Sequence, residues 1–129
     1  MTMSVFTVSS EAIGGMIVSL DMNDMRDMQQ ALQARYAGWW EPVDPEHGKN
    51  KLLWMLAELG EAIQVVKRNP ADDIAKPGAI RNEFVEEMAD VLMYFNNVLL
   101  CYGITPAEFE EIYRVKHERN LNRWKKPEA

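Results

Sequence analysis

The sequence predicts an all-α fold, a four-helix bundle behind a short N-terminal extension that is extended or β. Apolar residues recur at three- and four-residue spacing in four segments, and proline and glycine mark the connections between them. The 129 residues are the size of one domain. Four helices with short connections favour an antiparallel bundle. We therefore divide the chain into an extension, residues 1–20, and a helical domain, residues 21–126.

The extension holds two β-prone segments, residues 5–8 and 16–20, separated by Gly14 and Gly15. Two short strands and a loose arm are both compatible with this pattern. The extension has no basic segment, and residues 9–11 interrupt its apolar run, so we do not interpret it as a signal peptide.

The first helix is expected to begin after Asp21 and to end near Gly38. Its apolar positions are Met25, Met28, Leu32 and Tyr36. A loop marked by Pro42 and Pro45 follows.

The second helix is predicted from about His47 to Arg68, stopped by Pro70, and residues 69–78 are predicted as a loop. The third helix spans about Ala79 to Tyr102, with Gly103 suited to the position after its end.

The fourth helix has a clear start. Thr105 is the expected N-cap, Pro106 the first helical residue and Glu108 the third, which together make a capping box. The helix is expected to reach about Trp124.

Composition excludes several classes of protein. The net charge of −6 argues against a general nucleic-acid binder, which is usually basic. Cys101, the single cysteine, permits no internal disulfide, and a reducing cytoplasm is the expected compartment. No run of about 18 apolar residues is present, so no membrane association is expected.

The second predicted helix carries two carboxylates in an otherwise apolar stretch, residues 52–66. Glu58 and Glu61 are three residues apart and share one face. Burying carboxylates is costly unless they are paired or bind a metal. An exposed pair, or pairing with arginine or lysine elsewhere, is the alternative.

The third helix carries a broad acidic face of Glu83, Glu86, Glu87 and Asp90. Glu87 and Asp90 repeat the spacing of the first pair, so the two pairs can converge when the helices pack. Carboxylates without nearby histidine or cysteine suit Mg²⁺ or Mn²⁺ rather than zinc. Neither histidine has a glutamate three residues before it, which excludes a ferritin-like di-iron centre. A solvated acidic face is the alternative.

The chain ends in a basic segment. Residues 114–126 hold six basic side chains and one acidic. Lys116, Asn120 and Arg123 are spaced to share a face and are candidates for holding phosphate oxygens. Favourable interaction with the helix dipole is the alternative, which we prefer for Lys125 and Lys126.

These residues resemble the MazG family of all-α nucleoside triphosphate pyrophosphohydrolases over about residues 50–126. Glu58-Leu59-Gly60-Glu61 matches its Glu-x-x-Glu motif, and Glu87-Met88-Ala89-Asp90 its Glu-x-x-Asp motif. Lys116-x-x-x-Asn120-x-x-Arg123 resembles its C-terminal signature. Ala57 departs from the pattern, since many relatives have another acid there.

The resemblance implies Mg²⁺-dependent hydrolysis of a nucleoside triphosphate to the monophosphate and pyrophosphate, by a homodimer or homotetramer. The implied metal ligands are Glu58, Glu61, Glu87 and Asp90, and Mn²⁺ is an alternative ion. Lys116 and Arg123 would stabilise phosphoryl oxygens, and Asn120 would bond phosphate or sugar. Glu83 and Glu86 are candidates for the general base, Lys51 and Asn97 for substrate contact, and Trp39 for base stacking.

Several alternatives stay open. For Lys51 we prefer the interpretation as a surface lysine. Asn97 is also interpreted as a capped or exposed amide, and Trp39 as a packing residue. A phosphoribosyl-ATP pyrophosphohydrolase has similar helices, and a non-catalytic helical oligomer that binds nucleotide or metal is the alternative outside enzymes.

Overall fold

A computed structural model of the chain describes residues 19–124, 126 and 127. Within them the regular elements are all helical, which confirms the all-α fold class. They are α1 (Met22–Arg35), the 3₁₀ turn η2 (Pro45–His47), α2 (Gly48–Arg68), α3 (Ala71–Ala75), α4 (Ala79–Cys101) and α5 (Pro106–Arg123). The predicted N-terminal extension lies outside the described residues except for its last two.

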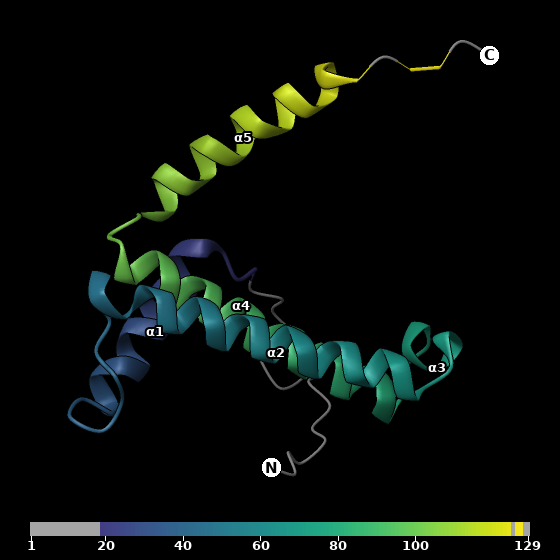
Figure 1. Cartoon of the computed structure of the whole chain (residues 1–129), viewed down its shortest axis with the longest axis horizontal. Coiled ribbons are helices and arrows are strands. Elements are labelled where there is room, and N and C mark those ends of the chain that lie inside the picture. Colours follow the sequence, from purple (N-terminus) through teal and green to yellow (C-terminus); the bar gives the residue numbers. More distant parts are fainter. Residues whose placement is uncertain (1–18, 125, 128–129) are drawn as a thin grey trace.

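Helices α2 and α4 lie side by side and form the body of the molecule (Figure 1). Ala62 and Val65 of α2 and Leu99 and Cys101 of α4 are its buried apolar residues. The chain turns back between the two helices, so they are antiparallel. Helix α1 packs against α4 and closes one end of the pair.

The helix ends follow the sequence closely. Gly103 has a φ of +65°, a conformation that favours glycine, and Ile104 N–H donates to the carbonyl of Leu99 at 2.9 Å. Thr105 caps α5 by accepting from Glu108 N–H at 3.2 Å, which is half of the predicted capping box. A complete capping box stands instead at the start of α1, between Asp21 and Asp24.

The predicted loop 69–78 contains the short helix α3, which is a correction to the sequence reading. An ion pair of 3.2 Å between Lys76 and Asp73 lies at its end, and Arg81 donates to two of its carbonyls. A helix of five residues is too short to leave an apolar periodicity.

Helix α5 departs from the predicted bundle. It extends away from α2 and α4 and touches the rest of the chain only near its start (Figure 1). There Phe109 meets Phe95 of α4 edge to face, with ring centroids 5.1 Å apart. Residues 111–124 are all exposed. The single chain therefore packs three long helices together and leaves the fourth without a partner along most of its length.

Large apolar side chains remain exposed on three helices. On α2 they include Leu52, Leu56, Leu59, Ile63 and Val66, the apolar face predicted from sequence; on α4, Val85, Met88 and Leu92; on α5, Ile112, Tyr113, Val115 and Leu121. An apolar surface of this extent commonly marks an interaction site. None of the helices in the described part of the chain combines the length and hydropathy of a membrane span.

Candidate functional site

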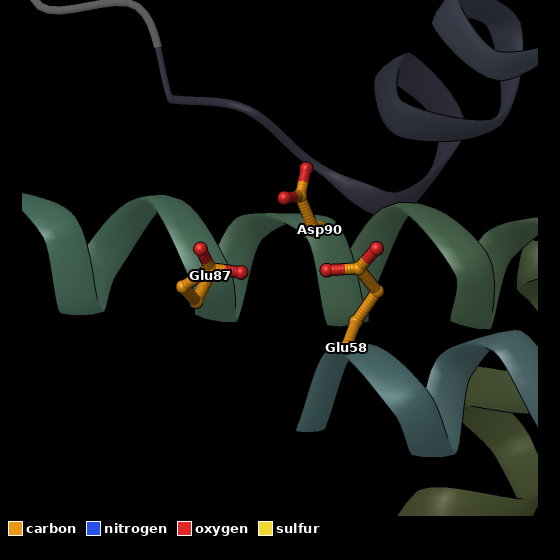
Figure 2. Close-up of side chains that lie close together, drawn as sticks. All are labelled: Glu58, Glu87 and Asp90. Atoms are coloured by element: carbon orange, nitrogen blue, oxygen red, sulfur yellow. The ribbon is translucent and has the colours of Figure 1, made fainter. Parts of the chain in front are cut away.

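Three carboxylates meet where α2 faces α4. Glu58 reaches across from α2 towards Glu87 and Asp90 of α4 (Figure 2). Each offers an oxygen, and these oxygens all lie within 4.8 Å of one another. The three-residue spacing of Glu87 and Asp90 puts both on the same side of α4, and the antiparallel packing brings Glu58 opposite them. We call Glu58, Glu87 and Asp90 the acidic trio.

The trio is electrostatically strained. Burial, followed by repulsion from Asp90 and Glu61, raises the pKa of Glu58. Burial and the neighbouring carboxylates also raise the pKa of Glu87, and burial raises that of Asp90. The pKa of Tyr94 is raised by burial and by the charges of Glu58 and Asp90. The site therefore favours neutralisation of its carboxylates.

No basic side chain neutralises the trio within the described residues. The ion pairs found there join other groups, such as Arg68 with Glu83 at 3.3 Å. All three donors are hard carboxylate oxygens, which suit Mg²⁺ or Mn²⁺. The donor set thus fits a divalent cation.

The trio borders a cavity of about 760 Å³. This is a volume typical of small-molecule sites. Its lining comes from α1, the loop after it, α2 and α4. The lining residues are Gln29, Leu32, Trp39, Trp40, Glu41, Lys51, Trp54, Glu58, Glu61, Glu87, Asp90, Met93, Tyr94 and Asn97.

Aromatic side chains form much of the cavity wall beyond the trio. Trp54 meets Tyr94 edge to face, with centroids 6.0 Å apart. Trp39 is 86% exposed, whereas Trp40 stacks on Tyr36 at 4.5 Å. Trp39 is therefore free to meet a ligand, and Trp40 is held by packing.

The remaining lining includes three buried polar side chains. Lys51 is only 3% exposed, and Gln29 and Asn97 are each 7% exposed. The Lys51 ammonium lies 4.6 Å from the centroid of the Trp54 ring and donates to the carbonyl of Glu41 at 3.4 Å. Gln29 donates to Asn97 Oδ1 at 3.1 Å. Burying such groups is costly unless they are hydrogen-bonded, as all three are here.

Seven of the predicted site residues line this one cavity. They are Glu58, Glu61, Glu87, Asp90, Lys51, Asn97 and Trp39. Glu61 lines it without belonging to the trio, and its side chain is exposed. The reading of Lys51 as a surface lysine is wrong, since this residue is almost completely buried.

The two predicted general bases lie outside the cavity lining. Glu83 is one helical turn before Glu87, beyond the end of the cavity, and pairs with Arg68. Glu86 is adjacent to Glu87 in sequence and therefore points about 100° away around α4.

The predicted phosphate contacts also lie apart from the cavity. Lys116, Asn120 and Arg123 are exposed on α5, and the guanidinium of Arg123 lies over the Trp124 ring at 5.0 Å. The departure of α5 from α2 and α4 keeps this face away from the acidic trio within one chain (Figure 1).

Sequence reasoning did not single out Gln29, Trp54 or Tyr94 as site residues. Tyr94 carried a usable signal, because it lies one turn after Asp90 on the same face of α4. Trp54 likewise shares a face of α2 with Glu58, one turn before it. Gln29 is one of three glutamines in α1, with Gln30 and Gln33, and no local pattern distinguishes it from the other two.

The raised pKa values predict how stability depends on pH. The folded state binds protons at the trio more tightly than the unfolded chain does, so protonation of the trio adds to the free energy of unfolding. This stabilisation is fully present below the ordinary carboxylate pKa of about 4 and is lost as the pH rises through the raised pKa values. In EDTA, the melting temperature of the wild type should therefore fall more between pH 4 and 7 than that of a Glu58→Gln, Glu87→Gln, Asp90→Asn variant. The melting temperatures are measured by calorimetry. If those of the wild type and the variant change in parallel with pH, the mutual repulsion of the carboxylates is contradicted.

No family model, curated protein or solved structure matches the chain. The functional inference accordingly depends on the geometry of the site and on the motifs in the sequence.

Proposed function

We propose that the protein is a Mg²⁺-dependent nucleoside triphosphate pyrophosphohydrolase, which cleaves between the α and β phosphates. The observation that carries the proposal is the position of the acidic trio on the border of an aromatic-lined cavity. Carboxylates that suit a hard cation and aromatic faces that suit a base are the two halves of a nucleotide site. The motif resemblance adds the class of reaction.

Glu58, Glu87 and Asp90 would hold the metal, which when bound supplies charge neutralisation at the phosphates and lowers the pKa of water. Glu61 would act beside them. It lines the cavity outside the trio, so its carboxylate is available to accept a proton from the attacking water. Glu61 thereby takes the place of Glu83 and Glu86 as our candidate general base.

The phosphate contacts of Lys116, Asn120 and Arg123 would come from a second copy of the chain. A cytoplasmic homodimer or homotetramer would cover the exposed apolar faces of α2 and α4, and the unpartnered α5 is available to enter it. The basic side chains of α5 complement the negative charge of the acidic helices. Arginine and lysine are suited to phosphate oxygens.

The test is an assay of products. The protein is incubated with Mg²⁺ and each ribo- and deoxyribonucleoside triphosphate, and with phosphoribosyl-ATP. Monophosphate, pyrophosphate and inorganic phosphate are measured separately. We expect equal amounts of monophosphate and pyrophosphate. Turnover of phosphoribosyl-ATP alone would select that alternative. Release of inorganic phosphate alone, or no turnover of any substrate, would contradict the proposal.

A further inference from the structure

The end of the cavity away from the trio can be located by the register of the two antiparallel helices. Glu58 lies opposite Asp90, and Trp54, four residues earlier, lies opposite Tyr94, four residues later. A further step of three residues each way puts Lys51 opposite Asn97. Burial raises the pKa of the Cys101 thiol and the Lys51 charge opposes this effect, which agrees with Lys51 lying at this level of α4.

Hydrogen bonds fix the orientation of both amides here. The Gln29 Nε2 donates to the carbonyl of Met93 at 3.3 Å and to Asn97 Oδ1 at 3.1 Å. A carbonyl only accepts, so the amide nitrogen of Gln29 must point to it. The Oε1 of Gln29 and the Nδ2 of Asn97 are left without a partner among the described residues.

Both of these atoms belong to residues that line the cavity. Every fully buried side-chain nitrogen or oxygen in the described part of the chain has a hydrogen-bond partner. The two unpartnered atoms therefore retain some exposure, although Gln29 and Asn97 are each only 7% exposed. Both residues line the cavity. Polar atoms held in this way can read a ligand, because leaving them unpaired is costly.

The three polar groups have a defined order. Asn97 on α4 is in the middle, since Lys51 faces it from α2 and Gln29 bonds to it from α1. The cavity thus presents a donor from Lys51, a donor from Asn97 Nδ2 and an acceptor from Gln29 Oε1, in that order.

The geometry points to cytosine as the base that this end of the cavity recognises, an inference that rests on the proposed nucleotide hydrolysis. The pairing edge of cytosine offers two adjacent acceptors, O2 and N3, and then the N4 amino donor. These match Lys51, Asn97 and Gln29 in turn. Trp39 and Trp54 supply aromatic faces for stacking.

The other bases fit less well. Uracil and thymine place a donor, N3–H, against the Asn97 donor and an acceptor, O4, against the Gln29 oxygen. Guanine offers two donors followed by an acceptor, the opposite of what is needed. Adenine can satisfy Asn97 and Gln29 but has a C–H where Lys51 needs an acceptor.

The distance to the trio agrees with one bound nucleotide. Asn97 is seven residues after Asp90, or about 10 Å along the helix at 1.5 Å per residue. That separation is comparable to the span from the α phosphate to the pairing edge of the base. Lys51 is as far from Glu58 along α2, which places it at the base rather than at the phosphates.

The first test compares nucleotides that differ at the pairing edge. Binding of CMP, UMP, AMP and GMP in Mg²⁺ is followed by tryptophan fluorescence, and kcat/KM is measured for CTP and UTP. We expect the affinity for CMP to exceed that for UMP, and kcat/KM for CTP to exceed that for UTP, by roughly tenfold to hundredfold. Equal binding, or a preference for any other base, overturns the inference.

Asn97→Asp makes the test specific to the middle position. The aspartate keeps an oxygen for Gln29 and replaces the Nδ2 donor by an acceptor, which repels N3 of cytosine and accepts from N3–H of uracil. The C-over-U ratio should fall at least tenfold. Asn82→Asp adds the same charge near the start of α4, outside the cavity lining, and should keep the ratio. An unchanged ratio in Asn97→Asp overturns the inference.

The binding measurements separate this inference from the proposed function. Turnover of CTP and UTP at equal rates supports the hydrolase and overturns the base assignment. Selective binding of CMP without turnover of any triphosphate supports the base assignment and contradicts the hydrolase. The wild-type comparison needs no variant, so it holds even where Asn97→Asp does not fold.

Discussion

Asp90→Asn is expected to lower pyrophosphate release by about a hundredfold to a thousandfold while raising the melting temperature of the metal-free protein. The substitution removes one of three oxygen donors that suit a divalent cation, and metal stabilisation of the transition state is worth several kcal/mol. It also removes a partly buried negative charge that contributes to the raised pKa of Glu58 and Glu87. Loss of function and gain of stability should therefore occur together.

The measurements are pyrophosphate release and thermal unfolding with EDTA and with Mg²⁺. We expect Mg²⁺ to raise the melting temperature of the wild type and to have little effect on Asp90→Asn. Asp72→Asn, an exposed position on α3, makes the same chemical change and should leave both properties within about twofold or a degree of the wild type. An active Asp90→Asn that still responds to Mg²⁺ would exclude Asp90 as a ligand.

Ile63→Glu is expected to convert the proposed oligomer to a monomer of 14.9 kDa. Ile63 lies on the exposed apolar face of α2, and burying an unpaired carboxylate in an interface costs several kcal/mol. At about 1.4 kcal/mol per tenfold in affinity, the dissociation constant should rise by orders of magnitude. Activity should fall as well, because the phosphate contacts of α5 are proposed to come from a second copy.

Light scattering coupled to gel filtration gives the mass directly. Gln64→Glu is the matched control, because it adds the same charge to the same helix. Gln64 is a polar, exposed residue adjacent to Ile63. It should keep the mass of the wild type. A wild type that is monomeric at all concentrations would refute the proposed assembly, and so would an Ile63→Glu oligomer of unchanged mass.

The elements of the fold could largely be predicted from the sequence because each has a local cause. The apolar spacing, Gly103 and the Thr105 cap define α4 and the start of α5 within a residue or two. The exit direction of α5 has no such cause. Its apolar residues alternate with charged ones, and a pattern of that kind does not tell whether the partner belongs to the same chain or to another copy.

The acidic half of the site could be predicted in the same way, since a three-residue spacing fixes the face of a helix. The trio follows from Glu58, Glu87 and Asp90 once α2 and α4 pack. The polar half could not, because Gln29 comes to Asn97 from a helix 68 residues away in sequence. Glu83 and Glu86 lie outside the cavity lining, because an acidic helix face is wider than the part of it that the cavity reaches.

The most direct test of the central claim is the position of a bound metal. Crystals grown with Mn²⁺ allow the ion to be located by anomalous scattering, independently of any assay. We predict the strongest anomalous peak between the carboxylates of Glu58, Glu87 and Asp90, where their oxygens already lie within 4.8 Å of one another. Crystals at saturating Mn²⁺ with no peak at the trio would contradict the account.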